Sequence, residues 1–307
     1  MKFGFGVDLG GTTVKIALFT REGELVTKWE IPTDTSDNGK NILSDIAAAV
    51  TGCMTQRGIA KEDCLGIGLC IPGPVTDDGM VNRCVNLGWG VFNAEKALSD
   101  LTGLPVQAGN DANVAALGEY WALGGGGDMV MVTLGTGVGG GIVLGGKLLS
   151  GTHGCGGEIG HINLKTGEKR TCGCGNHGCA EQYCSATGIV NTGKDYLASF
   201  TGETVLSADT LTSKAIFDAA AAGDQAALAI TELYYADLGR FLSMLTAVLD
   251  PEVIVLGGGV SKAGQPLLEG VARHYANYAF HGTQGVRFAL AKLGNDAGSI
   301  GAFRLLG

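Results

Sequence analysis

The chain contains 307 residues, of which 45% are hydrophobic, and its 21 Lys and Arg against 30 Asp and Glu give a formal net charge of −9. This size predicts two domains or one large α/β unit with a substantial core, whereas the acidic balance argues against nucleic-acid binding. The lack of a long apolar run argues against a membrane span, and the N-terminal residues show no signal-peptide pattern, so we expect a cytoplasmic globular protein, most often an enzyme.

The first part of the chain predicts a sheet covered by helices. Segments rich in Val, Ile and Phe between glycine turns predict strands, and apolar residues at helical spacing, such as Ile42, Ile46 and Val50, predict a helix. Strands are expected over residues 2–9, 13–19, 24–31, 65–71 and 105–110, and helices over residues 41–57 and 111–123.

After residue 128 the pattern starts again with a strand, a glycine turn and a second strand. The residues from Asp8 to Thr12 and those from Thr133 to Gly137 share this arrangement, which indicates two copies of one structural unit; two unrelated glycine hairpins are the alternative. The rest of the chain predicts mainly helices, and Pro251 ends the longest of them. Strands are expected over residues 129–134, 141–146, 252–259 and 286–291, and helices over residues 224–249, 265–279 and 298–306.

The first glycine turn has the composition of an anion-binding loop. In the sequence DLGGTT at residues 8–13, the backbone N–H groups of Gly10 and Gly11 can form a nest for phosphate, and the hydroxyls of Thr12 and Thr13 add donors. A carboxylate beside such a nest, here Asp8, can hold Mg²⁺ through waters. A plain hairpin turn is the alternative interpretation.

The second glycine turn, Gly135-Thr136-Gly137-Val138-Gly139-Gly140, matches the G-x-G-x-x-G pattern of dinucleotide-binding proteins. That pattern requires a helix after the turn, whereas a second strand is expected here, so we reject a Rossmann site. We also reject a P-loop at residues 141–147, because Leu148 stands where Mg²⁺ needs a Ser or Thr hydroxyl. A hairpin that wraps phosphate groups is the interpretation that remains.

A short segment rich in glycine gathers four metal-ligating residues: His161, Cys172, Cys174 and Cys179. The spacing H-x10-C-x-C-x4-C is typical of tetrahedral zinc. Because four protein ligands fill the coordination sphere, the predicted Zn²⁺ is structural and has no open position for water. Buried reduced thiols or disulfide chemistry are the alternative, and the other, scattered cysteines are interpreted as packing residues.

Three acids and one amide are candidates for substrate chemistry. Asn110 and Asp111 stand where a strand ends and a helix begins, so Asp111 is either a helix N-cap or a general base at the edge of a cleft. Glu158 precedes the cysteine segment and Glu181 follows it, so this pair could accept hydrogen bonds from the vicinal hydroxyls of a sugar. Two solvated acids are the other interpretation of the pair.

Several segments in one order, including DLGGTTVKIA, NDANVAALGE, GEIGHI and CGCGNHGCAEQYCSATG, resemble the ROK family (repressor, open reading frame, kinase) of the actin-like ATPase superfamily. The resemblance covers essentially the whole chain and is strongest to the bacterial glucokinases of the family. Repressors of this family carry a DNA-binding helix-turn-helix before the DLGGT strand. That strand begins at residue 2 here, so the kinase branch is expected.

The resemblance implies a fold of two ribonuclease-H-type α/β domains flanking a cleft. We expect a small domain over residues 1–111, completed by a C-terminal helix at 298–307, and a large domain over residues 112–297 with its zinc segment at 161–179. The family pattern places ATP at Asp8, Gly10, Gly11, Thr12, Thr13, Gly135, Thr136, Gly137, Gly257, Gly258 and Gly259, and the sugar at Gly73, Asn86, Asn110, Asp111, Glu158, His161 and Glu181.

The activity implied by the resemblance is ATP-dependent phosphorylation of glucose at its 6-hydroxyl, with Asp111 as the catalytic base, Mg²⁺ accompanying ATP, and structural Zn²⁺. Members of the family are commonly dimers, so a homodimer is expected. The alternatives are a kinase for N-acetylmannosamine, N-acetylglucosamine, fructose or allose, a non-catalytic sugar sensor, and an actin-like ATPase that acts on a protein partner. The preferred hexose, the choice between ATP and polyphosphate, and regulation stay open at this point.

Overall fold

The computed structural model describes residues 2–307, which divide into two compact units. Unit 1 comprises the residues up to Gly126 together with Gly141–Gly157 and Lys292–Gly307, and unit 2 comprises Gly127–Gly140 and Glu158–Ala291. The boundary expected after residue 111 differs from this division. The reason is that the helix which follows it packs backbone to backbone on the C-terminal helix: a Cβ at Gly301 would lie 1.8 Å from the carbonyl oxygen of Val114.

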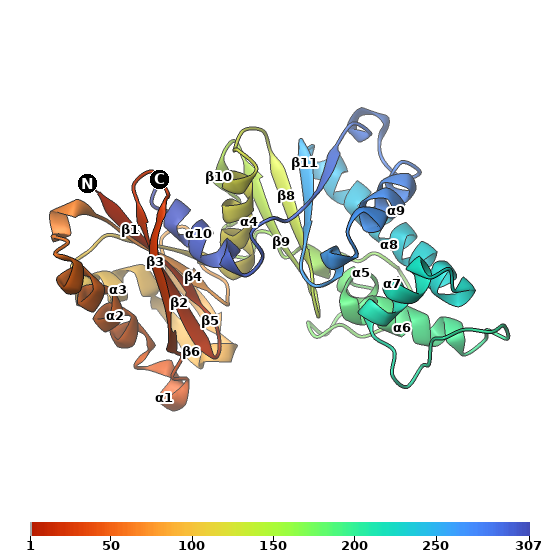
Figure 1. The fold of residues 1–307 in the computed structure, drawn as a ribbon, viewed down its shortest axis with the longest axis horizontal. Coiled ribbons are helices and arrows are strands. Elements are labelled where there is room, and N and C mark those ends of the chain that lie inside the picture. Colours follow the sequence, from red (N-terminus) through yellow and green to blue (C-terminus); the bar gives the residue numbers. More distant parts are fainter. Residues whose placement is uncertain (1) are drawn as a thin grey trace. The chain divides into compact units, whose positions relative to one another are not determined.

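Unit 1 is built on a five-stranded sheet with the strand order β3-β2-β1-β4-β7. Figure 1 labels β1, β2, β3 and β4 of this sheet. Neighbours among β1, β2 and β3 run antiparallel, whereas β1, β4 and β7 are parallel. The strands are β1 (Phe3–Leu9), β2 (Thr13–Thr20), β3 (Leu25–Pro32), β4 (Cys64–Ile71) and β7 (Val106–Asn110).

Successive side chains along each strand point to opposite faces of the sheet, so apolar side chains lie on both faces. Helices cover both of these apolar faces. Phe5 and Val7 belong to a core with α2 (Ile42–Arg57) and α3 (Ala94–Thr102). Phe19 packs instead on Phe303 of the C-terminal helix, and Cys70 packs between that helix and α4. The helices of this second face are α4 (Asp111–Ala122) and α10 (Ala297–Arg304).

Shorter elements complete unit 1 around the ends of the sheet. A two-stranded sheet pairs β5 (Met80–Cys84) with β6 (Trp89–Asn93). The remaining elements are α1 (Ser36–Gly39) and the 3-10 turns η1 (Lys61–Asp63), η2 (Val85–Leu87) and η6 (Gly294–Asp296).

The second sheet has the strand order β10-β9-β8-β11-β12, and β8, β11 and β12 are parallel. Its strands are β8 (Met129–Leu134), β9 (Val138–Leu144), β10 (Lys147–Leu148), β11 (Val253–Gly257) and β12 (Arg287–Leu290). In the division given above, β8, β11, β12 and the start of β9 belong to unit 2, whereas β10 and the part of β9 from Gly141 onward belong to unit 1. Unit 2 also holds α5 (Glu181–Cys184), α6 (Ala186–Leu197), α7 (Ser213–Ala221), α8 (Gln225–Leu249) and α9 (Gln265–Tyr275), with the 3-10 turns η3 (Ile159–His161), η4 (Val260–Ala263) and η5 (His281–Thr283).

The expected strands and helices are confirmed, with differences at their ends. The strand expected over residues 141–146 begins earlier, at Val138, because the glycine turn is closed by a hydrogen bond from Gly135 N to the carbonyl oxygen of Gly137 (3.0 Å). The elements α3, β5 and β6 were not expected from the sequence. Within residues 2–307 no helix is both long and apolar enough to cross a bilayer.

Candidate active site

The candidate residues of unit 1 lie at the carboxyl ends of its parallel strands. Asp8 of β1 stands opposite Cys70 of β4, and Ile71 stands opposite Asn110, the last residue of β7. Because the carboxyl ends of parallel strands meet at one edge of a sheet, this register brings the DLGG turn and the Asn110–Asp111 pair to the same edge.

Asn110, and not Asp111, caps helix α4. Its Oδ1 accepts hydrogen bonds from the backbone N–H groups of Ala112 (3.0 Å) and Asn113 (3.3 Å), and its Nδ2 donates to the carbonyl oxygen of Gly73 (3.1 Å). Asp111 is the first residue of the helix and its side chain is exposed. The N-cap interpretation therefore applies to Asn110, whose side chain ties the helix start to the Gly73 turn.

Two cysteines that the sequence suggested were packing residues adjoin these candidates. Burial raises the pKa of the Cys70 thiol well above its ordinary value, and the nearby carboxylates of Asp8 and Asp111 raise it further. Cys84 donates a hydrogen bond to the carbonyl oxygen of Pro72 (3.0 Å). Burial also raises the pKa of Cys84, so both thiols stay protonated beside the acids.

Gly73 and Asn86 meet at Cys84. A Cβ on Gly73 would lie 3.2 Å from the Cys84 sulfur, and the backbone of Asn86, in η2, interacts with the same sulfur. The structure thus brings Gly73 and Asn86 together at the Cys84 thiol, with the Asp111 carboxylate nearby, and a hydrogen bond joins Gly73 to Asn110.

The carboxylate of Asp8 packs closely against the backbone of helix α10 at Gly298. A Cβ added to Gly298 would lie 2.6 Å from the Asp8 carboxyl carbon, so only glycine leaves room for the carboxylate there. The ammonium group of Lys15 lies 3.7 Å from Asp8 Oδ2.

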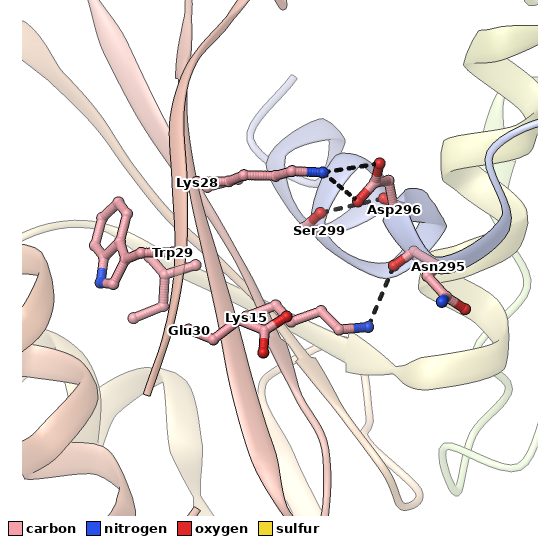
Figure 2. Close-up of a pocket in the computed structure, with 9 residues that line it drawn as sticks. Lys15, Lys28, Trp29, Glu30, Asn295, Asp296 and Ser299 are labelled. Atoms are coloured by element: carbon pink, nitrogen blue, oxygen red, sulfur yellow. Dashed lines mark hydrogen bonds and ion pairs between the residues drawn. The ribbon is translucent and has the colours of Figure 1, made fainter. Parts of the chain in front are cut away.

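Lys15 also lines a hollow of about 390 Å³ between β2, β3 and the start of α10, where Lys28 contacts Asp296 at 3.1 Å (Figure 2). This hollow contains none of the residues expected to bind sugar or nucleotide.

In unit 2, His161, Cys172, Cys174 and Cys179 form a cluster whose ligand atoms all lie within 4.8 Å of one another. Cys172 Sγ is 3.5 Å from His161 Nδ1, and Cys174 Sγ is 3.8 Å from Cys179 Sγ. Tetrahedral coordination at ordinary Zn–S and Zn–N lengths requires separations of about 3.8 Å for two sulfurs and about 3.6 Å for sulfur and nitrogen. The four residues therefore fit Zn²⁺, and they are the one such cluster within the described chain.

The two glutamates adjoin this cluster on different sides. Glu158 Oε2 lies 3.7 Å from His161 Nε2, the ring nitrogen that faces away from the cysteines. Glu181 Oε1 lies 3.6 Å from Cys172 Sγ, and Glu181 Oε2 accepts a hydrogen bond from the backbone N–H of Val138 (3.1 Å). Glu158, His161 and Glu181, which the sequence analysis expected to bind the sugar, thus all lie at this cluster in unit 2.

The second glycine turn lies against residues 257–259. A Cβ on Gly258, which has a φ of +82°, would lie 2.5 Å from the carbonyl oxygen of Leu134. Gly135 and Gly259 have no atom within 4 Å of an added Cβ, so both present open backbone, as Gly11 does in unit 1. Such exposed glycine backbone suits the close approach of a phosphate or ribose.

Comparison with known proteins agrees with these features. The ROK family model matches residues 4–307. A glucokinase of Halalkalibacterium halodurans is 44% identical over 96% of this chain and 92% of its own length. An N-acetylmannosamine kinase of Escherichia coli is 34% identical over 96% of this chain and 95% of its own.

A solved structure gives the same result. The ROK family glucokinase of Streptomyces griseus, crystallised with glucose and AMPPNP, has a TM-score of 0.73 at 32% identity and covers 99% of this chain and 98% of its own. The match of the family model over nearly the entire length, with the glycine turns and the His–Cys cluster in place, shows that this chain belongs to the ROK family.

Proposed function

We propose that the protein is a glucokinase, which transfers the γ-phosphoryl group of ATP to the 6-hydroxyl of glucose. The observation that carries this proposal is the 44% identity to a glucokinase over 96% of the chain. A second observation supports the proposal: the carboxylate of Asp111 begins helix α4, whose N-cap is the neighbouring Asn110.

Asp111 is proposed as the catalytic base. Its place at the end of β7 suits it to accept the proton of the sugar hydroxyl as the oxygen attacks phosphorus, and general-base assistance of this kind contributes about 10²–10⁴-fold in rate. Asn110 and Gly73, joined by a hydrogen bond of 3.1 Å, and Asn86 would contact the other hydroxyls.

The glycine turns are proposed to bind ATP. The N–H groups of Gly11 and Gly137, with the hydroxyls of Thr12, Thr13 and Thr136, would donate to phosphate oxygens, and residues 257–259 would lie along the adenosine. Gly10 N and Gly135 N close their turns by donating to the carbonyl oxygens of Thr13 and Gly137 (3.0 Å each), so the part of Gly10 and Gly135 would be to leave room for the phosphates. Mg²⁺, when bound with ATP, would neutralise part of the negative charge of the phosphates. Asp8, whose carboxylate has room beside Gly298, would orient the waters around this ion.

The His161–Cys cluster is proposed to hold a structural Zn²⁺, which when bound cross-links the segment that carries the two glutamates. His161 Nδ1 faces the cysteines while Nε2 faces Glu158, so the imidazole can serve the cluster and a sugar hydroxyl at once. Glu158 and Glu181 would accept hydrogen bonds from vicinal hydroxyls.

We also propose a homodimer. Support comes from membership of the ROK family, whose proteins are commonly dimers. Sedimentation or light scattering at several concentrations tests this point.

N-acetylmannosamine is the second candidate substrate, because the kinase of Escherichia coli for that sugar is 34% identical over nearly the same span. ADP release with Mg-ATP, measured for glucose, N-acetylmannosamine, N-acetylglucosamine, fructose and allose one at a time, decides between them. Glucose should give the highest kcat/KM. A higher value with N-acetylmannosamine would replace the proposed substrate, and ADP release that no sugar stimulates would overturn the sugar kinase.

A further inference from the structure

Glu181 contacts the phosphate-binding turn directly. The glutamate expected to bind the sugar accepts a hydrogen bond from the backbone N–H of Val138, the residue at which the second glycine turn becomes strand β9. A Cβ on Gly137 would lie 2.1 Å from Glu181 Oε2, so the carboxylate occupies the space that any side chain at position 137 would need.

A second segment with a residue expected to bind the sugar, the turn η3, also contacts Val138. In η3, which carries His161, a Cβ on Gly160 would lie 2.2 Å from the carbonyl oxygen of Val138. The peptide groups of Val138 are therefore held on one side by Glu181 and on the other by the backbone that carries His161. The turn itself is tied at its start, because Ala186 N donates to the carbonyl oxygen of Gly135 (2.8 Å).

Helix α5, which begins with Glu181, is anchored by the side chains of Lys165, Arg170 and Tyr234. The ring of Tyr183 is buried between two cations, with Lys165 Nζ at 4.3 Å and the Arg170 guanidinium carbon at 4.8 Å from the ring centroid. Arg170 also donates to the carbonyl oxygen of Gln182 (3.0 Å), and Tyr234 donates to that of Cys184 (2.7 Å). These contacts anchor the backbone of α5, so the Glu181 side chain extends to Val138 from a fixed position.

We propose that Glu181 couples the two substrates: Glu181 Oε2 already accepts a hydrogen bond from Val138 N, and a sugar hydroxyl donated to the same carboxylate keeps it in this position, which holds residues 135–138 in the shape that receives ATP phosphates. The proposal rests on the proposed function. Linkage then requires that sugar tightens nucleotide binding and that nucleotide tightens sugar binding by the same factor.

The measurement is the coupling factor, the Kd of a non-hydrolysable ATP analogue with Mg²⁺ in the absence of glucose divided by its Kd at saturating glucose, obtained by calorimetry. For the unaltered protein we expect a factor of about 5–150, the usual range of such couplings. The reciprocal experiment, glucose titrated with and without the analogue, should give the same factor.

Gly137→Ala is the decisive variant, since its methyl group forces the carboxylate away from Val138 N while Glu181 is kept. Its coupling factor should fall to about 1–2, a near-complete loss of the coupling measured by linkage. Gly135→Ala is the matched control in the same turn, because an added Cβ there meets no atom within 4 Å. This control should keep the factor of the unaltered protein, whatever its affinity for the analogue alone.

Glu181→Ala removes the acceptor itself and serves as the second variant if Gly137→Ala does not fold; at saturating glucose it too should show a factor near 1. A factor near 1 in the unaltered protein overturns the proposal, as does full coupling in Gly137→Ala or its equal loss in Gly135→Ala. Phosphorylation of glucose by the unaltered protein is scored separately, so failure of the coupling leaves the glucokinase assignment standing, and absence of turnover removes both.

Discussion

The two units of the molecule position their candidate residues by different means. In unit 1, Asp8 lies near the end of β1 and Asn110 ends β7, the two parallel strands on either side of β4, and Asp111 follows as the first residue of α4. The ladder of backbone hydrogen bonds fixes the register of these strands. In unit 2, Glu158 lies at the start of a 3-10 turn and Glu181 begins a helix of four residues, with a cluster of side chains between them. Regular secondary structure therefore places the candidates of unit 1, whereas those of unit 2 lie beside an irregular segment that the proposed Zn²⁺ would cross-link.

The largest effect is expected in unit 1 from Asp111→Asn. The amide keeps the shape of the side chain but accepts a proton far less readily, so kcat should fall about 10²–10⁴-fold while the Kd for glucose changes little. Steady-state kinetics with calorimetry measures both. Asp100→Asn, on the exposed face of α3, is the matched control and should leave kcat unchanged. Near-normal turnover in Asp111→Asn would falsify the assignment of the base.

The next effect tests the cross-link of unit 2. Cys174→Ser should remove stoichiometric zinc, lower the unfolding temperature and raise KM for glucose about tenfold or more, since one charge-assisted hydrogen bond is worth ~1.5–3 kcal/mol. Metal analysis, thermal unfolding and kinetics check this. Cys155→Ser is the control, because this thiol is exposed and lies outside the cluster. A zinc-free purified protein with ordinary KM would show that the cysteines do not act through metal.

A smaller effect tests how far unit 1 depends on its C-terminal helix. Glu119 of α4 is fully buried and accepts hydrogen bonds from the N–H groups of Lys292 (2.8 Å) and Leu293 (2.7 Å), just before α10. Glu119→Gln replaces one acceptor with a donor that faces an N–H group, so the free energy of unfolding should fall by about 1–3 kcal/mol.

Urea denaturation measures the loss, and Glu252→Gln is the control, since Glu252 forms an exposed pair with Arg287 whose removal should cost less than about 1 kcal/mol. Equal losses in the two variants would show that the buried carboxylate has no special part in holding the segment before α10.

The smallest effect is expected at the hollow of Figure 2. Lys28→Met breaks an ion pair whose side chains are 58% and 50% exposed, so stability should change by less than ~1 kcal/mol and kcat/KM should not change. Urea denaturation and kinetics test both. A marked fall in kcat/KM would mean that this hollow takes part in the reaction.

Much of the fold follows from local signals. The strands on either side of the glycine turns, the helix that starts at Asp111 and the end of α8 before Pro251 were all predictable, because β-branched runs, turn glycines and proline act locally. The gathering of His161 with three cysteines was also predictable, since metal-ligand spacing is a property of the sequence. The elements β5 and β6 were missed because they are short and lack strong alternation of apolar and polar residues.

The roles of Cys84, Gly137, Gly160 and Gly298 could not be read from the sequence. Each is defined by what an atom at that position meets: a carbonyl oxygen, a carboxylate or a distant backbone. Gly298 lies far along the chain from Asp8, and no local preference marks it as the residue that leaves room for that carboxylate.

The sequence by itself determined which groups are present and in what order: two glycine turns, four zinc-type ligands, and acids beside each, because turns, strands and ligand spacing depend on neighbouring residues. Tertiary structure alone decided that the Asn110 side chain joins the start of α4 to Gly73, and that one glutamate contacts both the cysteine cluster and the second glycine turn. Such contacts join residues distant in the chain, and they arise only when packing and hydrogen bonding have fixed the backbone.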